Sequence, residues 1–367
     1  MNEMKVLHIC WDLGQGGIQR YLVDLLSFHK ERFSSRVIVL STPGALSEEV
    51  SGLCKGVDYV GMSNGLDASA LMRILKLLKA HDYDVIHTHA NNAILALALK
   101  FQSGPVLFTE HGGRLLNRDR GALLFYKYLS SNIDRFIAIS QYMADMMCAE
   151  NASIHSRIKV IHNGVDYDHI VEACRAGTVV SDLPVGQKVG FVGRLTSDKG
   201  IDLFIETARL VHAERPEVAF IVVGEGPAKE EMQVLVESYG LEESVHFLGY
   251  RKDAREIIGS LNLCLFTSRY EGFGLVVAES LAAGVPVVAM DERSAVSELI
   301  RNGVEGVLVK GLDTSGAAKE VIRLLDDPDL MERMSSAGRD RAKEFTIARN
   351  ADLVAEEYLK LMETTTT

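Results

Sequence analysis

The sequence has few cysteines, no long hydrophobic run and no excess of positive charge. Its five cysteines are scattered, and no two of them have C-x-x-C spacing. This pattern disfavours a disulfide framework or a zinc knuckle and predicts reduced thiols that pack in the interior. No hydrophobic run approaches the roughly 20 residues that a membrane-spanning helix needs, which argues against an integral membrane protein. Residues 1–5 lead directly into the short apolar run 6–9, which does not fit a signal peptide, so we expect a cytoplasmic protein.

The net charge is −11, and all of the acidic excess lies in the second half of the chain. An acidic protein is a poor binder of nucleic acid, because neutralisation of phosphates drives that binding. The nearly neutral first half is the part that would approach an anionic surface. Hydrophobic residues make up 47% and charged residues 24% of the sequence, which is ordinary globular usage and disfavours a disordered chain, a collagen or a coiled coil.

Short apolar runs alternate with helical patterns along the chain, and this alternation predicts an α/β protein with parallel sheets. The length of 367 residues predicts two domains. We expect strands at 6–10, 36–40, 85–88, 106–109, 135–139 and 159–161, and again at 188–192, 219–223, 245–248, 263–266, 287–289 and 306–308. The alternation breaks at 168–186, which we interpret as a linker between two doubly wound halves that face a cleft.

A glycine-rich loop follows the first predicted strand and precedes a helix. Gly14, Gly16 and Gly17 let backbone N–H groups approach an anion at a helix N-terminus. The third glycine of a dinucleotide fingerprint is missing and no acid ends the next strand, so binding of NAD is disfavoured. A plain tight turn remains the alternative for this loop.

Two cations follow the strand predicted at 188–192. Arg194 and Lys199 lie just past its carboxyl end, where doubly wound sheets bind ligands. A guanidinium fork and an ammonium suit a diphosphate. The alternative is a solvated charged loop, and the position at a strand end favours the binding role.

The strongest motif runs from Glu271 to Glu279, after the strand predicted at 263–266. Gly272 and Gly274 bring the backbone close to a ligand, and a helix that opens there offers free N–H groups to phosphate. A carboxylate one turn into that helix is well placed to accept hydrogen bonds from a ribose diol. Either acid taken alone is more often a surface charge, so the inference depends on the context.

Residues at the carboxyl ends of strands in the first half give weaker indications of a site. His111 follows one strand, where we prefer a role in the site to a purely structural one, and Asn163 ends the last strand of that half. Two imidazoles, His87 and His89, lie on one face of a strand, but the sequence offers no obvious third ligand.

In this order the motifs resemble glycosyltransferase family 4, the retaining sugar-nucleotide enzymes of GT-B fold. The resemblance covers nearly the whole chain and rests on the Gly16-Gly17 loop, His111, Asn163-Gly164-Val165-Asp166, Gly193-Arg194-Leu195, Lys199-Gly200, Gly224-x-Gly226-Pro227, Glu271-x7-Glu279 and Gly284-Val285-Pro286-Val287-Val288. It implies an acceptor-side Rossmann-like domain at 1–167, a nucleotide-sugar domain at 187–345 and a last helix, about 349–362, that crosses back to the first domain.

The resemblance also implies roles for the motif residues. Arg194 and Lys199 would stabilise the leaving diphosphate, and the Gly16 and Gly17 amides would help to hold the distal phosphate. Glu279 would hold the ribose hydroxyls, and His111 would lie near the anomeric carbon. The donor sugar and phosphates would be gripped by Glu271 and by the backbone around Gly272, Phe273, Gly274 and Leu275. Asn163 and His89 are weaker candidates.

One loop departs from the family pattern. Many members have two glycines after the Pro-Val-Val strand, whereas this chain has residues 290–298, with Glu298 but without the glycines. The contacts made by that loop therefore cannot be carried over from the family.

We expect no cofactor and no essential metal. Asp82-x-Asp84 precedes a strand, and Asp166-x-Asp168 belongs to a turn, so we interpret both pairs as capping or loop acids.

The expected activity is transfer of a hexose, with retention, from a nucleoside diphosphate sugar to a hydroxyl of a glycan or a lipid-linked acceptor. UDP is favoured over GDP, and assembly of cell-surface polysaccharide or lipopolysaccharide is the expected pathway. The mixed basic and apolar segment 114–128 would contact the inner face of the plasma membrane, and a buried helix is the alternative. The alternative functions are a sugar-nucleotide epimerase of the same fold, a two-domain binding protein without chemistry and, less favoured, a dehydrogenase.

Overall fold

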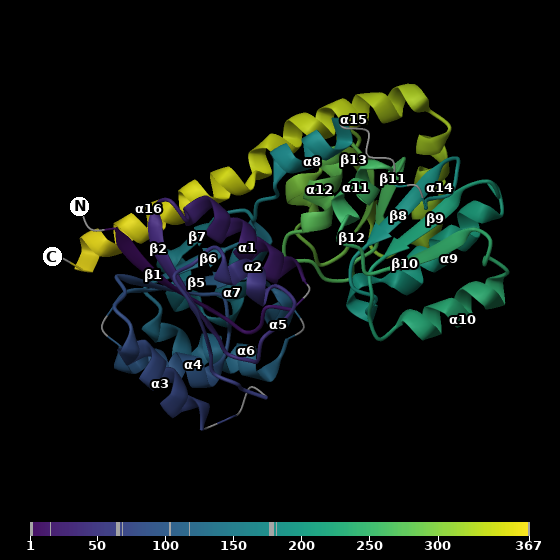
Figure 1. The fold of residues 1–367 in the computed structure, drawn as a ribbon. Coiled ribbons are helices and arrows are strands. Elements are labelled where there is room, and N and C mark those ends of the chain that lie inside the picture. The colour runs from purple at the N-terminus through teal and green to yellow at the C-terminus, as the bar shows by residue number, and fades with distance from the viewer. Residues whose placement is uncertain are drawn as a thin grey trace. The chain divides into compact units, whose positions relative to one another are not determined.

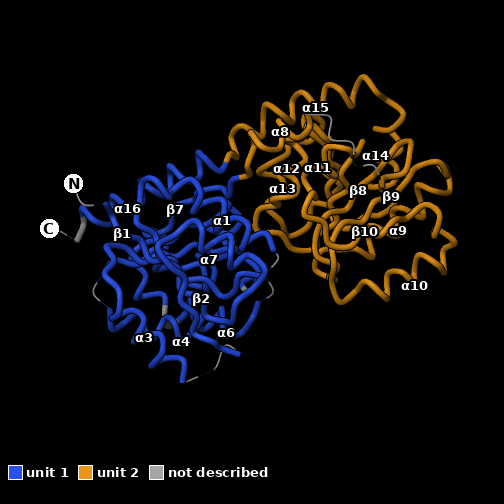
Figure 2. Tube along the Cα trace, viewed as in Figure 1, with its two compact units in different colours: residues 1–164, 347–367 blue, residues 165–346 orange. Residues whose placement is uncertain are grey.

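The structure is a computed structural model that describes residues 3–14, 16–63, 67, 69–102, 104–116, 118–175, 180 and 182–365. The chain divides into two compact units (Figure 2). Unit 1 comprises Met1–Gly164 together with Ile347–Thr367, and unit 2 comprises Val165–Thr346. Each unit is an α/β layer structure built on a parallel sheet (Figure 1).

The sheet of unit 1 has seven parallel strands in the order β3-β2-β1-β4-β5-β6-β7. Its strands are β1 (Met4–Cys10), β2 (Phe33–Val39), β3 (Val57–Tyr59), β4 (Val85–Thr88), β5 (Val106–Glu110), β6 (Arg135–Ala138) and β7 (Ile158–Val160). The central strands β1, β4 and β5 are almost entirely buried, because helices cover both faces of the sheet. The edge strand β3 was not among the expected strands. The strand order reverses between β1 and β4, and doubly wound sheets bind ligands at the carboxyl ends beside such a point.

The helices of unit 1 are mostly short. They are α1 (Gly17–His29), α2 (Ser47–Ser51), α3 (Ala70–Ala80), α4 (Ala93–Ala98), α5 (Gly113–Leu116), α6 (Arg120–Leu124), α7 (Gln141–Glu150) and α16 (Ile347–Thr365). Further helical turns occupy Leu99–Phe101, Phe125–Leu129, Ser130–Asn132 and Ala152–Arg157.

The last helix, α16, packs on the sheet of unit 1 although it follows unit 2 in the chain. Its buried side chains recur at alternating spacings of four and three residues, which places them on one face of a helix. These side chains are Ile347, Ala351, Val354, Tyr358 and Leu361, and Ala355 lies beside them on the same face. They share one hydrophobic cluster with residues of α1, β1, β4 and β5.

The sheet of unit 2 has six parallel strands in the order β10-β9-β8-β11-β12-β13. Its strands are β8 (Lys188–Val192), β9 (Ala219–Val223), β10 (Val245–Gly249), β11 (Leu263–Phe266), β12 (Val287–Asp291) and β13 (Gly306–Lys310). The order reverses between β8 and β11, so the loops that follow these two strands meet at the point where such sheets bind ligands.

Helices cover the sheet of unit 2 (Figure 1). They are α8 (Tyr167–Arg175), α9 (Ile201–His212), α10 (Lys229–Tyr239), α11 (Ala254–Gly259), α12 (Leu275–Ala283), α13 (Val296–Leu299), α14 (Thr314–Leu325) and α15 (Pro328–Ala342), with short turns at Ser197–Lys199 and Lys343–Phe345. Helix α8 covers the first part of 168–186, the segment interpreted as a linker, so that part is helical. Residues 176–179 and 181 of that segment lie outside the described part of the chain.

All five cysteines are free thiols, and Cys10 and Cys264 are buried. Burial raises the pKa of the Cys264 thiol to about 11. Both observations agree with the interpretation of the cysteines as reduced packing residues.

A close backbone approach requires glycine at position 224. Gly224 has φ +137°, and a Cβ atom there would lie 1.8 Å from the Gly193 carbonyl oxygen. We expect Gly224→Ala to lower the free energy of unfolding by about 3 kcal/mol or more, as measured by urea denaturation, because strain and a backbone clash add.

Gly240→Ala is the matched control for this change. Gly240 also has a positive φ, +66°, but a Cβ atom there would meet nothing within 4 Å. We expect Gly240→Ala to lower the free energy of unfolding by only ~1–2 kcal/mol, the cost of placing a non-glycine residue in a left-handed conformation. Equal losses in the two variants would show that the approach to Gly193 is unimportant.

Candidate functional site

Three loops at the carboxyl ends of unit 2 strands are joined by backbone hydrogen bonds. The Gly193 N–H donates to the Val223 carbonyl at 3.0 Å, and the Leu195 N–H donates to the Glu225 carbonyl at 3.0 Å. The Thr267 hydroxyl donates to the Gly200 carbonyl at 2.8 Å. These bonds hold the loops after β8, β9 and β11 together, so the predicted site residues stand on a rigid edge of the sheet.

The two predicted cations follow β8 but have different surroundings. The Arg194 side chain is exposed and makes no ion pair with any described residue. Lys199 ends a short helical turn and places its Nζ 2.7 Å from Oε2 of Glu271, with both side chains mostly buried. The structure therefore brings Lys199 and Glu271 together, although the sequence separates them by 72 residues. Arg194 is free to receive an anion, while Lys199 and Glu271 hold each other in place.

The glycine-rich loop leads directly into α12. Gly274 has φ +99° and is the N-cap of this helix, and neither a side-chain cap nor an acid lies in its first turn. The first N–H groups of the helix, from Leu275 onward, therefore meet no side-chain cap. Phe273 is buried and its ring packs edge-on against Phe345, so only the backbone of Phe273 is suited to contact a ligand.

Glu279 lies one turn into α12 and forms an ion pair that the sequence did not predict. Its Oε1 lies 3.0 Å from Nε of Arg255, which belongs to α11. Both side chains are 17% exposed. Arg255 carried no recognisable signal in the sequence, because it stands outside every glycine-rich motif and joins the site only when α11 packs against α12.

The loop that lacks the family's two glycines has an unusual backbone of its own. Arg293 has φ +37°, a left-handed conformation that is uncommon for a residue other than glycine. Its guanidinium lies 4.4 Å from the centre of the Tyr270 ring. The Ala295 N–H donates to the Glu271 carbonyl at 3.1 Å, so the loop still supports the backbone of Glu271.

In unit 1, the first glycine-rich loop precedes α1. Gly16 is the extended N-cap of α1 and Gly17 is its first residue, and the first turn contains no acid and no side-chain cap. The Gly14 N–H donates to Oδ1 of Asp12 at 2.7 Å, which fixes the start of the loop. The loop therefore presents a helix N-terminus beside the β1–β4 reversal, as the sequence suggests. Gln15 lies outside the described residues.

His111 follows β5 and is connected to other histidines. Its Nε2 lies 3.1 Å from Nδ1 of His89, and Nε2 of His89 lies 3.4 Å from Nδ1 of His8. Burial lowers the pKa of His111 to about 3 and that of His8 to about 3, and it holds the pKa of His89 well below its usual value. These imidazoles are neutral at physiological pH. His111 Nδ1 is buried and has no hydrogen-bond partner among the described residues.

His8 is the third histidine beside His87 and His89, and the sequence pattern did not predict it. One nitrogen of each ring lies within 4.8 Å of the others, and all three side chains are buried. His87 Nδ1 pairs with the Tyr358 hydroxyl at 2.6 Å and Nε2 pairs with the Thr109 hydroxyl at 2.7 Å. Since both nitrogens of His87 are engaged, a metal bound there would have to break one of these bonds. The cluster therefore fits a hydrogen-bonded core better than a metal centre.

The acids that match D-x-D make structural contacts. Asp84 Oδ2 accepts from the Lys5 N–H at 2.7 Å at the amino end of β4, and Asp82 pairs with the Lys5 ammonium at 3.6 Å. Asp166 Oδ1 accepts from the His169 N–H at 3.2 Å at the start of α8. Asn163 is buried after β7, and its Oδ1 has no hydrogen-bond partner among the described residues.

The apolar side chains of segment 114–128 point mostly inward. Leu115, Leu116, Phe125 and Tyr126 are buried, and Leu124 is 52% exposed. Most of the apolar surface assigned to membrane contact is thus part of the core, as the buried-helix alternative predicts. No described helix of this protein is both long and apolar enough to cross a membrane.

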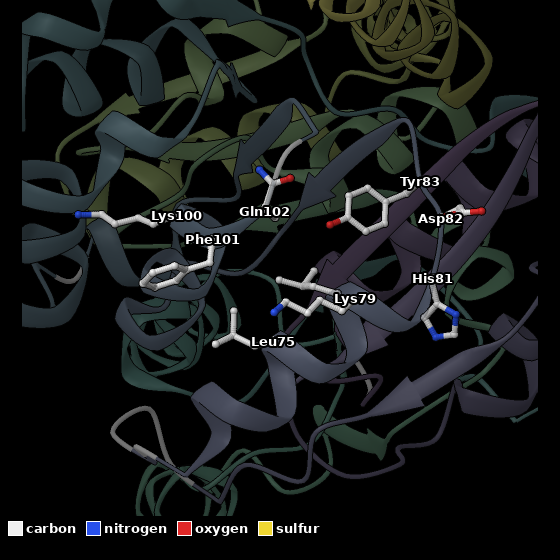
Figure 3. A pocket seen from close by; sticks show the side chains of 9 residues that line it. Leu75, Lys79, His81, Asp82, Tyr83, Lys100, Phe101 and Gln102 are labelled. Atoms are coloured by element: carbon white, nitrogen blue, oxygen red, sulfur yellow. The ribbon is translucent and has the colours of Figure 1, made fainter.

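A surface hollow of about 470 Å³ lies elsewhere in unit 1 (Figure 3). Among its lining residues, Tyr83 precedes β4 and Gln102 precedes β5, so it lies at the amino ends of these strands. Lys79, Lys100 and Phe101 also border it. The predicted site residues follow the carboxyl ends of the strands, and none of them lines this hollow.

Comparison with known proteins identifies both halves of the chain. The profile described as Glycosyltransferase Family 4 matches residues 15–169, and the profile described as Glycosyl transferases group 1 matches residues 185–341.

Curated relatives resemble the chain over most of its length. It is 28% identical to the putative glycosyltransferase EpsD of Bacillus subtilis, over 79% of this chain and 80% of that protein. It is 24% identical to the UDP-Gal:alpha-D-GlcNAc-diphosphoundecaprenol alpha-1,3-galactosyltransferase of Escherichia coli, over 98% of each. Among solved structures, HepE of Anabaena in complex with UDP-glucose shares the fold with a TM-score of 0.83, 24% identity and coverage of 96% of this chain and 99% of that one.

Proposed function

Since the chain belongs to glycosyltransferase family 4 and has the GT-B fold, we propose that it transfers a hexose with retention from a nucleoside diphosphate sugar to a hydroxyl group. UDP is favoured over GDP as the nucleotide. The acceptor is a glycan or a lipid-linked acceptor in the assembly of a surface polysaccharide or lipopolysaccharide. No metal and no cofactor takes part. The E. coli relative, whose name includes UDP-Gal and a diphosphoundecaprenol acceptor, supports this assignment.

The observation that carries the proposal is the arrangement at the β8–β11 reversal of unit 2. Exposed Arg194 follows β8, and the N-terminus of α12 follows β11. The Lys199–Glu271 pair, at 2.7 Å, joins the two loops that carry them. A cation and free N–H groups suit the diphosphate, and the Glu271 carboxylate suits the hydroxyls of the attached sugar.

These residues promote the reaction chiefly by stabilising the leaving group. As the bond between the anomeric carbon and the phosphate oxygen breaks, its electron pair moves onto the diphosphate. Arg194 and Lys199 neutralise the charge that develops there. The acceptor oxygen bonds to the anomeric carbon on the face from which the diphosphate departs, and the departing oxygen takes the acceptor's proton. This route needs no nucleophile from the protein, and positioning supplies much of the remaining rate.

A thermal-shift panel of UDP, GDP, ADP, NAD and several sugar nucleotides, each with and without EDTA, tests the proposal. We expect UDP and one UDP-sugar to stabilise the protein in a manner that EDTA does not change. At about one hundred times the dissociation constant, a ligand adds about 2.7 kcal/mol, which a melting curve resolves. A shift with NAD alone, or no shift with any nucleotide, would refute the assignment. A shift that EDTA abolishes would refute its metal-independent form.

A further inference from the structure

The ion pair between Arg255 and Glu279 joins α11 to α12, the helix whose N-terminus belongs to the proposed site. Arg255 belongs to α11 and Glu279 to α12, and these helices pack against each other. The Arg255 Nε atom lies 3.0 Å from Glu279 Oε1, within hydrogen-bonding distance. Nothing in the proposed chemistry of the diphosphate or the sugar requires an arginine at position 255.

The partial burial of this pair limits the motion of the carboxylate. Both side chains are only 17% exposed, so their hydrogen bond is poorly screened by water. An unpaired glutamate side chain on a helix samples several rotamers, and fixing it when a ligand binds would cost conformational entropy. Arg255 meets that cost in advance, because its planar guanidinium holds one carboxylate oxygen.

The bond leaves capacity on the carboxylate for a ligand. An ionised carboxylate has about four lone-pair sites, and the Arg255 Nε bond uses one of them. Two hydroxyls of a cis-diol need two acceptor sites with a fixed relative direction. A carboxylate whose plane is already held can offer them, whereas a rotating carboxylate offers them only part of the time.

We propose that Arg255 is a positioning residue that holds the Glu279 carboxylate for the 2′- and 3′-hydroxyls of a ribose, and so makes the site selective for ribonucleotides over 2′-deoxyribonucleotides. The inference rests on the proposed function, and it adds the residue that sets this selectivity. Arg255 itself need not touch the nucleotide. Its effect is transmitted through the orientation of Glu279.

The test is calorimetric titration of the full-length protein with UDP and with 2′-deoxyuridine diphosphate. We expect the wild type to bind UDP about tenfold more tightly than the deoxy analogue, because one charge-assisted hydrogen bond is lost. In Arg255→Ala we expect this preference to fall below about threefold while the UDP dissociation constant rises about tenfold. Arg255→Lys keeps the charge without the planar donor, so an intermediate preference is expected.

Two further variants separate positioning from a general effect on stability. Arg209→Ala removes an arginine that pairs with Glu206 in α9, also with an Nε–oxygen distance of 3.0 Å, and it should leave the preference unchanged. Glu279→Ala should abolish the preference, because it removes the acceptor itself. If Arg255→Ala does not fold, Arg255→Gln, which retains a hydrogen-bond donor, is compared with Arg255→Lys in the same titration.

The possible failures are distinguishable. An unchanged preference in Arg255→Ala, or in Arg255→Gln where the alanine variant does not fold, overturns the positioning role. A preference that survives in Glu279→Ala overturns the ribose role of Glu279 and the inference with it. Failure of the wild type to bind UDP, GDP or ADP overturns the proposed function instead.

Discussion

Replacing Arg194 by alanine is expected to lower turnover of the nucleotide sugar about 100- to 1000-fold, the usual loss when one preorganised donor to a developing negative charge is removed. Arg194 is exposed and pairs with no described acid. Its removal should therefore change the free energy of unfolding by less than about 0.5 kcal/mol. The measurement is release of nucleoside diphosphate under saturating donor, with urea denaturation of the same sample.

Lys199→Ala should cause a similar loss of turnover but also a loss of stability, because it leaves the mostly buried Glu271 carboxylate without its partner. Arg323→Ala on α14 is the control, since Arg323 pairs with Glu320 far along the chain from every site residue. Normal turnover in Arg194→Ala would remove this residue from the diphosphate site.

Stability should fall steeply as the pH is lowered from 6.5 towards 4. Burial lowers the pKa of His8 to about 3 and that of His29 to about 4, whereas both have a pKa near 6.5 in the unfolded chain. Below pH 6.5 the unfolded state therefore binds more protons than the folded state, and acid favours unfolding. At pH 5 each of these two groups lowers the free energy of unfolding by about 2 kcal/mol, since one pKa unit corresponds to about 1.36 kcal/mol. His87, His89 and His111 add to the loss.

The prediction is checked by urea denaturation at several pH values between 7.5 and 4.5. His8→Leu should make the pH dependence shallower, because one group that titrates only in the unfolded state is removed. His155→Leu is the control, since it also removes a histidine but from an exposed position outside the buried histidine cluster. A free energy of unfolding that stays constant down to pH 5 would contradict the neutral state of the histidine cluster.

Periodicity and motif order were sufficient to predict the parallel α/β architecture and most of the strands. They were less informative where the signal is short or depends on packing. Strand β3 has only three half-buried residues, one of them Asp58, so it has no apolar run to recognise. Helix α8 is nine residues long with a single fully buried side chain, Ile170, and it was interpreted as part of a linker.

The candidate site divides in the same way. Arg194, Glu271 and Gly274 stand at strand ends or in glycine-rich loops, so their positions follow from local sequence. The positions of His8 and Arg255 do not follow from local sequence. His8 lies inside β1 and meets the other histidines because β1 pairs with β4 in a register that places it beside His87. Arg255 needs the packing of α11 on α12, which no local pattern encodes.

The place of α16 has a consequence for the order in which the protein is made. Hydrogen bonds tie this helix to the rest of unit 1, among them Tyr21 to Asn350 at 3.0 Å, His29 to the Ala351 carbonyl at 2.9 Å and His87 to Tyr358 at 2.6 Å. During translation, all of residues 165–346 must emerge from the ribosome before these partners do. At about 5–20 residues per second that takes roughly 10–40 s. Until then the nascent sheet lacks the cover of one helix and exposes apolar and imidazole side chains. The N-terminal unit therefore matures last, and a fragment that stops at Gly164 should be prone to aggregate.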